Sequence, residues 1–480
     1  MSPLRVEIRV PDRFRNRAVC VFRTLSCILG VPFTIAPTGS RGPAEIAYGN
    51  DFPDDQPVAV PIPFDEAGYE ESTPFEAVVQ DGRILWRRRG ESDQRFDLIA
   101  GTYRLLQMLD ETQVAPGARD RRGIFGNEAL PAARAAVDSV PIVEHHAAAL
   151  LAMLLRARSA AGIEQAPKWP GGKTWAVCLT HDTDAVRAAA PWEVAVNLAK
   201  WLLRRKRLYL DLVKAGLRAR SSAEADPLFG FPHWREQESR RGLRSCFYLF
   251  VRTARTPLAL SDCKSSVRRS RFPWHVLAGL QRDGWEFGLH ASINAKHNLD
   301  SFLQAKHWIE DRLGAPIFGL RHHYWALDWH KPHLTFRKHV NAGFRYDTSI
   351  AWKTREGFRA ATCHPYRPFD PVYDRPLDLV EMPTCLMDAY FDGARDGLER
   401  CRAVLRRVRE SGGLAVLDWH TEVICNAFEF VGWYDLFEDL IGPLLDGDAW
   451  IATPWEIARH WRRREAQLLG EENGAVWAGT

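Results

Sequence analysis

The sequence predicts an α/β protein, a distorted (β/α)7-type barrel preceded by a smaller α/β N-terminal domain. Three observations lead to this fold class. After residue 173, strand-like apolar runs alternate with helical segments, as in a parallel sheet with about seven strand–helix units. The chain has 480 residues, which exceeds one ordinary domain. A segment rich in proline and glycine at 163–174, "IEQAPKWPGGKT", marks a boundary between two domains.

We therefore expect an N-terminal α/β domain of unknown role at 1–165, a barrel domain at 173–467 and a tail at 468–480. The first domain contains its own strand-like and helix-like runs. Its expected elements are strands at 4–10, 44–49 and 83–89 and helices at 15–30 and 97–111. No catalytic constellation is evident in this domain. Contact with the barrel mouth, a dimer interface and a partner-docking surface are all open roles for it.

The barrel domain has seven strand-like runs, and polar side chains follow five of them. The expected strands are 174–180, 244–250, 285–291, 316–321, 344–350, 377–383 and 413–419. The polar residues at their ends are Asp182 and Asp184 after the first, His290 in the third, Arg321 to Tyr324 in the fourth, Asp347 in the fifth and His420 after the seventh. Because the carboxyl ends of barrel strands share one face, these residues predict a single site.

Two aspartates one residue apart, in "LTHDTD", end the first of these strands. Strand alternation points Asp182 and Asp184 the same way and Thr183 the opposite way. Two close carboxylates repel each other unless a cation compensates, which favours a metal site or a proton-transfer pair. An ordinary strand-to-loop junction has the same composition, because Asp and Thr side chains bond to free backbone groups.

Bulk composition excludes several classes of protein. The net charge of +4, from 64 basic and 60 acidic residues, is too balanced for a nucleic-acid partner. Nine cysteines without C-x-x-C pairs indicate neither a disulfide framework nor a thiolate zinc site. We expect no transmembrane segment and a cytoplasmic location, because no apolar run reaches about 18 residues and no signal-peptide pattern is present. The sequence lacks a G-x-S-x-G elbow, which argues against a serine nucleophile.

The stretch 201–220, "WLLRRKRLYLDLVKAGLRAR", is basic and amphipathic. It could contact an anionic lipid surface, as a peripheral membrane contact, or an acidic glycan. We favour instead a solvated helix whose lysine and arginine stems cover the barrel. The oligomeric state does not follow from the sequence.

Four motifs carry a family resemblance. They are "THDTD" at 180–184, "EFGLHAS" at 286–292, "GLRHHYW" at 319–325 and "LDWH" at 417–420. In this order they resemble the NodB-homology polysaccharide deacetylases, carbohydrate esterase family four, which are metal-dependent enzymes with a distorted (β/α) barrel. The chain is most similar to a bacterial branch of that family with an extra N-terminal domain, which 96–111 and "DRRGIF" at 120–125 also resemble.

The resemblance implies that Asp182 is the general base and that Asp184 and His290 bind a divalent metal ion, zinc. A further histidine completes the metal site in the family, at the position that Asn294 occupies in this chain. An amide oxygen is a weaker zinc ligand than an imidazole, so another group has to substitute. The candidates are His323, which we favour, His297 and His181.

The third and fourth motifs imply the remaining roles. Arg321 would orient Asp182, and the backbone N–H of Tyr324 would donate to the oxyanion of the tetrahedral intermediate. His420 would protonate the departing amine, with Asp347 as the carboxylate that tunes it. We expect Asp418 to point away from the site. Two tryptophans, Trp325 and Trp419, either stack on a sugar or belong to the core.

The resemblance therefore implies a metal-dependent hydrolase of carbon–nitrogen bonds other than peptide bonds. Its substrate would be an N-acylated carbohydrate, and the enzyme would remove the acyl group, an acetyl group, from a sugar in a polysaccharide or glycan precursor. A catalytically silent barrel that serves as a glycan-binding or scaffold module is the alternative, and Asn294 supports it. A hydrolase of small cyclic amides is a third possibility.

Overall fold

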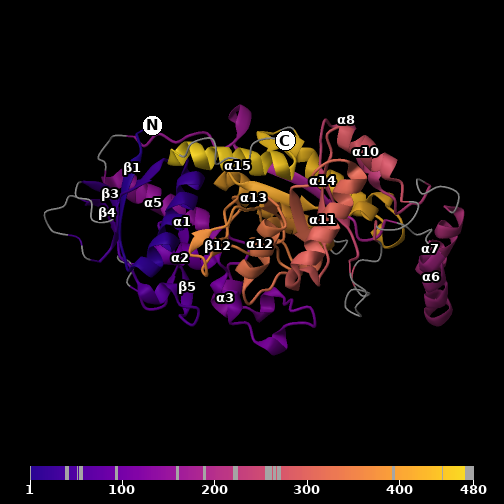
Figure 1. The fold of residues 1–480 in the computed structure, drawn as a ribbon, viewed down its shortest axis with the longest axis horizontal. Coiled ribbons are helices and arrows are strands. Elements are labelled where there is room, and N and C mark those ends of the chain that lie inside the picture. The colour runs from indigo at the N-terminus through magenta and orange to yellow at the C-terminus, as the bar shows by residue number, and fades with distance from the viewer. Residues whose placement is uncertain are drawn as a thin grey trace.

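The structure, a computed structural model, describes residues 2–37, 43–50, 52, 58–91, 96–157, 162–186, 191–219, 225–253, 262, 266–267, 272–391, 395–445 and 447–470. The barrel occupies the middle of the molecule (Figure 1). The N-terminal part lies at one end, and a pair of helices, α6 and α7, lies at the other.

A nine-stranded sheet forms the barrel, and all of its strand pairs are parallel. The sheet order is β14-β11-β10-β9-β8-β7-β16-β15, with β17 also paired to β7. The strands are β7 (Trp175–Asp182), β8 (Cys246–Phe250), β9 (Glu286–Ala291), β10 (Gly319–His322), β11 (Tyr346–Asp347), β14 (Val380–Glu381), β15 (Thr384–Met387), β16 (Leu414–Asp418) and β17 (Ala449–Ile451).

The two ends of this sheet are neighbouring segments of the chain. Strand β14 pairs with β11 at one end and β15 pairs with β16 at the other, and only two residues, one of them Pro383, separate β14 from β15. The backbone N–H of Thr384 donates to the carbonyl of Ile350 (2.9 Å), which continues the contact with the β11 side. The sheet therefore curls round on itself, and the predicted distorted barrel is confirmed.

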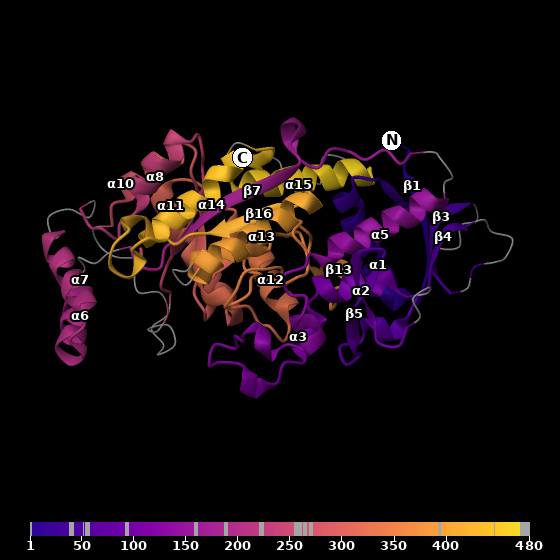
Figure 2. The same ribbon diagram turned by 180° about the vertical axis from the view of Figure 1, so that it is seen from behind.

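Helices cover the outside of the barrel (Figures 1 and 2). They are α8 (Phe231–Arg240), α10 (Trp274–Arg282), α11 (Leu299–Leu313), α12 (Pro332–Asn341), α13 (Arg395–Ser411), α14 (Trp433–Leu445) and α15 (Pro454–Leu469). Local signals set their ends: the Asn298 side chain caps α11, and Gly314 ends it in the left-handed conformation. All eight residues of β7 are buried, as expected for a strand covered on both faces.

The sequence predicted the long barrel strands more accurately than the short ones. The first, second, third, fourth and seventh expected strands correspond to β7, β8, β9, β10 and β16. The fifth and sixth are reduced to the two-residue strands β11 and β14, and β15 and β17 were not predicted. At the end of the barrel domain, α15 runs on to Leu469, while 471–480 of the expected tail lie outside the described residues.

The N-terminal part is a smaller α/β unit. Its four-stranded sheet has the order β2-β1-β3-β4 and is parallel throughout, and β5 and β6 form a separate antiparallel hairpin. The elements are β1 (Leu4–Arg9), α1 (Asp12–Leu29), β2 (Phe33–Ile35), β3 (Ala44–Gly49), β4 (Val58–Ile62), β5 (Phe75–Gln80), β6 (Arg83–Arg88), α2 (Leu98–Leu106), α3 (Leu109–Thr112), α4 (Ala132–Ala135) and α5 (Ile142–Ala157). The helix expected at 97–111 is divided at Met108, whose φ is 52°.

A buried ion pair joins this unit to the barrel. The Arg359 guanidinium donates to both carboxylate oxygens of Glu111, at 2.8 to 3.1 Å, and lies 3.3 Å from the centroid of the Trp329 ring. Arg134 donates to the carbonyls of Phe358 and Arg359, both at 3.0 Å. One continuous hydrophobic cluster includes residues of both parts, so the N-terminal unit is packed against the barrel rather than loosely tethered to it.

The basic amphipathic stretch is not one helix over the barrel, and that expectation is wrong. Two helices, α6 (Pro191–Arg204) and α7 (Arg207–Arg218), pack against each other as a hairpin that projects from the end of the barrel (Figures 1 and 2). The chain reverses at Arg205, whose φ is 53°. Among the described residues, no helix has the length and apolar character to cross a bilayer.

Candidate active site and metal centre

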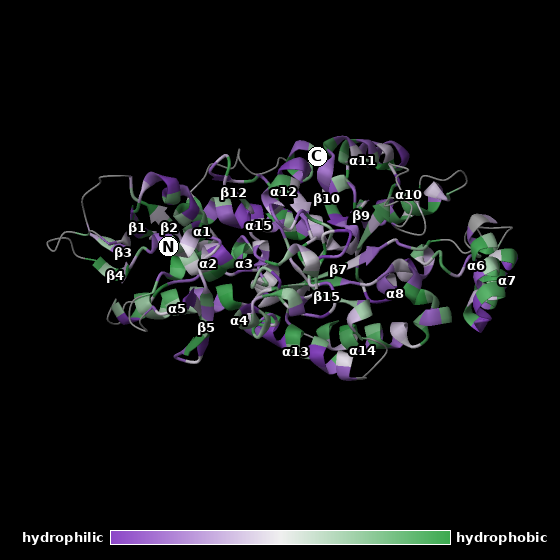
Figure 3. Cartoon of the chain, turned by 90° about the horizontal axis from the view of Figure 1, so that it is seen from below, coloured by the Kyte–Doolittle hydropathy of each residue, from purple (hydrophilic) through white to green (hydrophobic). Residues whose placement is uncertain are grey.

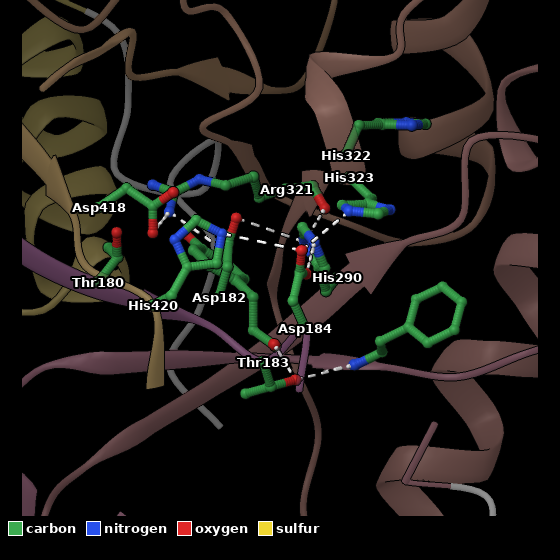
Figure 4. A network of polar contacts seen from close by, with 12 residues as sticks. Thr180, Asp182, Thr183, Asp184, His290, Arg321, His322, His323, Asp418 and His420 are labelled. Carbon is green, nitrogen blue, oxygen red and sulfur yellow. Dashed lines mark hydrogen bonds and ion pairs between the residues drawn. The ribbon is translucent and has the colours of Figure 1, made fainter. Parts of the chain in front are cut away.

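Side chains from four barrel strands meet at one end of the barrel (Figure 4). Asp182 ends β7 and Asp184 follows it, His290 lies on β9, Arg321 lies on β10, and His420 follows β16. The structure therefore brings together residues that are up to 238 positions apart, from Asp182 to His420. The Asp184 and His420 side chains keep 22% and 20% of their exposure, so the cluster opens to solvent there.

The side chains at the end of β7 alternate between the two faces of the strand, as expected. The Thr183 hydroxyl donates to the carbonyl of Tyr248 (2.8 Å) and accepts from the backbone N–H of Phe250 (3.2 Å), so Thr183 faces the neighbouring strand β8. Asp182 and Asp184 both face His290: Asp182 Oδ2 lies 3.7 Å from Nδ1, and Asp184 Oδ1 lies 3.1 Å from Nε2. The two carboxylates therefore share one site.

Three of these side chains form a cluster suited to a metal ion. Asp184 Oδ1 lies 3.1 Å from His290 Nε2, and Asp184 Oδ2 lies 2.9 Å from His323 Nε2. One ligand atom from each residue lies within 4.8 Å of the others. His290 Nε2 is buried and faces the Asp184 carboxylate. Two imidazoles and a carboxylate whose donor atoms converge in this way fit a divalent cation, and this donor set is typical of catalytic zinc.

Each imidazole is oriented through its other nitrogen. His290 Nδ1 lies 3.2 Å from the carbonyl oxygen of Arg321, and His323 Nδ1 bonds to the carboxylate of Asp262. When these Nδ1 atoms donate, both Nε2 atoms carry a lone pair toward Asp184. Second bonds of this kind fix the tautomer and the ring direction in metal sites.

Asp262 is a site residue that the sequence reasoning missed. Its carboxylate also accepts from the Ser292 hydroxyl (2.5 Å) and from the backbone N–H of Ile293 (3.1 Å), so it connects the turns that follow β9 and β10. Asp262 lies in the segment after β8, at the same edge of the barrel as the other site residues. Its position after a strand was the available signal, but the 11 residues between Phe250 and Asp262 obscured it.

The electrostatics of the cluster favour positive charge. Burial alone would lower the pKa of His323, but the carboxylates of Asp184 and Asp262 raise it to about 9. Burial alone would raise the pKa of Asp184, but the imidazoles of His323 and His290 hold it well below its usual range. At neutral pH the cluster therefore holds an ionised carboxylate and a proton on His323, which a divalent cation at Nε2 would have to displace.

We expect metal binding at pH 7 to release about one proton. Because the pKa of His323 is about 9, the ring is protonated below that pH, so the apparent metal affinity should rise about tenfold per pH unit up to pH 9. Calorimetric titration with zinc in two buffers of different ionisation enthalpy measures the released proton.

The Asp262→Asn variant provides the matched test. Removing this carboxylate should lower the pKa of His323, reduce the proton release and weaken metal binding by about 10- to 100-fold. Asp283→Asn, at a more exposed carboxylate paired with Arg235, should behave like the wild-type protein. Equal proton release from the wild-type protein and Asp262→Asn would contradict the role given to Asp262.

The other two histidines considered for the third ligand are not members of the Asp184, His290 and His323 cluster. His181 Nε2 lies 3.0 Å from Glu238 Oε1 and its Nδ1 lies 2.7 Å from the carbonyl oxygen of Trp419, so the ring is engaged outside the cluster. His297 is exposed in the short helix η5 (Ala295–His297). Asn294 precedes that helix, and its backbone N–H donates to the Ser292 hydroxyl (3.4 Å). Asp184, His290 and His323 complete a three-ligand group without these residues.

Arg321 lies between two carboxylates. Its Nη1 lies 3.2 Å from Asp182 Oδ1 and 2.9 Å from Asp418 Oδ1, and its other nitrogens bond to the hydroxyls of Thr348 and Thr384, both at 3.1 Å. The expectation that Asp418 points away is therefore wrong. Burial and the charge of Asp182 raise the pKa of Asp418 well above its usual range, against the opposing effect of Arg321. Asp418 therefore binds a proton more readily than an ordinary aspartate does.

Two other groups of potential ligands suit a metal less well. Asp182, Asp418 and His420 lie close together, but Arg321 already supplies positive charge to both carboxylates. Glu144, Cys363 and His364 lie where α5 meets the barrel. There Glu144 Oε1 already accepts from the Thr362 hydroxyl (2.6 Å), the backbone N–H of Cys363 (2.9 Å) and the His364 ring (2.8 Å).

The carboxylate beside His420 is Asp388, so the assignment of Asp347 is wrong. His420 Nδ1 lies 3.0 Å from Asp388 Oδ1, and the backbone N–H of His420 donates to Asp388 Oδ2 (2.7 Å). Asp347 instead lies 2.7 Å from His339 Nδ1 and accepts from the backbone N–H of Ser349. Burial alone would lower the pKa of His420, but Asp388 raises it well above its ordinary value.

The turn after β10 is strained and forms part of the rim. Tyr324 and Trp325 have φ values of 57° and 56°, which is unusual for two successive residues with side chains. The Tyr324 side chain is 38% exposed, whereas Trp325 and Trp419 are buried, so these two tryptophans belong to the core. The Arg122 guanidinium of the N-terminal part lies 3.9 Å from the centroid of the Tyr324 ring. The N-terminal part therefore contacts the barrel mouth.

No family model matches the chain, and no curated protein matches it in sequence. Solved structures are similar in fold. A polysaccharide deacetylase from Mycobacterium smegmatis is 22% identical with a TM-score of 0.40, and the match covers 63% of this chain and 93% of that one. The PuuE allantoinase is 12% identical with a TM-score of 0.41, covering 62% and 94%. A polysaccharide deacetylase from Pseudomonas aeruginosa PAO1 is 14% identical with a TM-score of 0.40, covering 64% and 96%.

Two of these structures are described as polysaccharide deacetylases. All three are less than 25% identical to this chain, and their TM-scores are near 0.4.

Proposed function

We propose that this chain is a metal-dependent hydrolase of carbon–nitrogen bonds other than peptide bonds, which removes the N-acetyl group of a sugar. The observation that supports this proposal is the proximity of three parts: the Asp184, His290 and His323 cluster, the Asp182–Arg321 pair and the Asp388–His420 pair. A cation site, a proton acceptor and a proton donor are the parts that hydrolysis of an amide requires.

Each group has one role in the proposed hydrolysis. A divalent cation, zinc, would polarise the amide carbonyl and acidify water when bound by Asp184, His290 and His323. Asp182 takes a proton from the attacking water, and Arg321, 3.2 Å away, orients that carboxylate. The backbone N–H of Tyr324 donates to the developing oxyanion.

Departure of the amine requires a proton. An amide anion is a very poor leaving group, so the nitrogen has to be protonated as the carbon–nitrogen bond breaks. Asp388 holds His420 in place and raises its pKa, which keeps the ring protonated at neutral pH. His420 Nε2 lies 3.8 Å from Asp184 Oδ2, so the donor lies beside the cation cluster.

The substrate class follows from the deacetylase proposal: an N-acetylated sugar in a polysaccharide or glycan precursor. A cytoplasmic location stays a prediction, and it would favour a lipid-linked or nucleotide-linked precursor over a finished polysaccharide. The silent-barrel alternative is less consistent with the site, because a scaffold has no need of a base, its orienting arginine and an acid around one cation cluster.

The test combines metal analysis with turnover. The purified protein should hold about one divalent ion and release acetate from N-acetylated oligosaccharides. His323→Ala should lose the ion and the activity together, whereas the matched variant His297→Ala, at an exposed histidine, should keep both. Metal retention in His323→Ala would overturn the ligand assignment. Turnover of small cyclic amides, or tight glycan binding without turnover, would overturn the deacetylase proposal in favour of the alternatives.

A further inference from the structure

The projecting hairpin of α6 and α7, here called the basic hairpin (191–218), has a charge unlike that of the rest of the chain. It contains seven basic and two acidic residues, a net charge of +5, whereas the whole chain has a net charge of +4. Four of the cations are consecutive at the tip, where the chain reverses. They are Arg204, Arg205, Lys206 and Arg207, and all are exposed. The hairpin therefore presents a concentrated positive charge away from the barrel.

Exposed leucines lie next to these cations. Leu203 is 85% exposed and Leu202 is 51% exposed, directly before the four basic residues. Leu198 (41% exposed) lies one turn earlier on the same face of α6 as Leu202. Figure 3 shows apolar and polar residues interleaved on both helices. Exposed leucine beside arginine and lysine is typical of helices that bind at a membrane interface, where the leucines enter the acyl region and the cations meet anionic headgroups.

Two aromatic residues complete this pattern near the tip. The Arg205 guanidinium lies 5.2 Å from the Trp201 ring centroid, and Arg204 Nη1 lies 3.4 Å from the Tyr209 hydroxyl. Tryptophan and tyrosine prefer the boundary between headgroups and acyl chains. An acidic glycan would account for the cations but would leave the exposed leucines in water, so the combination favours an anionic lipid surface.

The middle of α7 packs beside the candidate active site. Leu212 of α7 packs in a small apolar cluster with Ala185, Leu228 and Phe428. Ala185 directly follows Asp184, and Phe428 lies in the segment that follows His420. Hence the same loops that carry the site residues also hold the hairpin, and the position of the hairpin is coupled to the position of the barrel mouth.

We propose that the basic hairpin docks the protein on an anionic lipid bilayer surface, with its tip in the interface and the barrel mouth held near the membrane. Docking itself is independent of the chemistry at the site. The consequence that the substrate is a lipid-linked glycan precursor rests on the proposed function. Docking is therefore tested by lipid binding, and the substrate by turnover.

The test uses the full-length protein and vesicles of phosphatidylcholine with or without phosphatidylglycerol. Flotation should show binding only to the anionic vesicles, and binding should weaken as the salt concentration rises. Changing the four tip cations to glutamine should weaken binding more than about tenfold. Leu202→Ser/Leu203→Ser should also release the protein, at unchanged charge. None of these changes touches the candidate metal site, so metal content and acetate release from a soluble oligosaccharide should stay as in the wild-type protein.

A matched charge control separates docking from general attraction. Four exposed arginines on α8, α11 and α13 are changed to glutamine in this control, and it should bind the vesicles like the wild-type protein. They are Arg240, Arg312, Arg406 and Arg409. Equal binding of the tip variant and this control would overturn the proposal. A second result would also overturn the proposal: binding of a soluble acidic polysaccharide that is equally strong in the wild-type protein and in Leu202→Ser/Leu203→Ser. That result would indicate that the basic hairpin binds a glycan.

Discussion

Replacing Asp182 with asparagine is expected to lower kcat for deacetylation by about 10²- to 10⁴-fold while the metal ion stays bound. The amide has nearly the shape of the carboxylate and can still contact Arg321, 3.2 Å away in the wild-type protein, but it cannot accept a proton. Asp182 is not part of the Asp184, His290 and His323 cluster, so metal content should be close to that of the wild-type protein. Acetate release and metal analysis on the same sample measure both quantities.

Two neighbouring carboxylates serve as controls for this prediction. Asp184→Asn should lose the metal ion and the activity together, because Asp184 contacts both imidazoles of the cluster. Asp418→Asn should be milder, since burial and Asp182 raise the pKa of Asp418 and an amide resembles the protonated form of the carboxyl. If Asp418→Asn has the larger effect on kcat and Asp182→Asn is active, Asp418 is the base and the roles of the pair are exchanged.

The barrel could be predicted from the sequence because its long strands have a strong signal. Strand β7, "WAVCLTHD", is buried along its whole length, and its first five residues form a continuous apolar run. Strand β15, "TCLM", follows Pro383 and has only four residues, so local pattern gave no reason to expect it. That omission explains the error at Asp347. Asp388 follows β15 and bonds to His420, but without the strand there was no reason to place Asp388 at the barrel mouth.

The error at Asp418 has a different origin. Residues two apart on an extended chain share a face, so alternation itself places Asp418 on the same side as His420 and puts Trp419 on the other. The structure follows this rule: Asp418 contacts Arg321, whereas Trp419 packs against Phe391 and Phe437. Strand alternation therefore predicts the position of Asp418 correctly, and the expectation that Asp418 points away applied the rule wrongly.

His323 was favoured as a ligand from the sequence, but the contact that orients its ring lies in no sequence window. His323 follows β10 in a turn with two successive left-handed residues, and Asp262, 61 positions earlier, bonds to its ring. The basic hairpin illustrates a similar limit. A periodic stretch at 201–220 has the same amphipathic pattern whether it forms one helix or two, and the reversal at Arg205 decides between them.

His420→Asn is expected to lower kcat for an N-acetylated sugar by about 10²- to 10⁴-fold, but to change the hydrolysis of an activated aryl acetate by much less. The amine needs a proton as it departs, whereas a nitrophenolate leaves as a stable anion without one. The ratio of the two rates therefore reports on proton donation. A loss of the same size with both substrates would contradict the role of His420 as the acid and would indicate damage to the cation cluster, because His420 Nε2 lies 3.8 Å from Asp184 Oδ2.

The pH profile of Asp388→Asn completes the test of His420. An acid catalyst works only while protonated, so activity falls as the pH rises through its pKa. Asp388 raises the pKa of His420 well above its ordinary value, which extends the active range of the wild-type protein toward alkaline pH. Removing that charge should move the alkaline limb of kcat to lower pH, while Asp347→Asn, at a carboxylate bound to His339, should leave the limb in place. If the alkaline limb moves in Asp347→Asn and not in Asp388→Asn, the carboxylate that tunes His420 is Asp347.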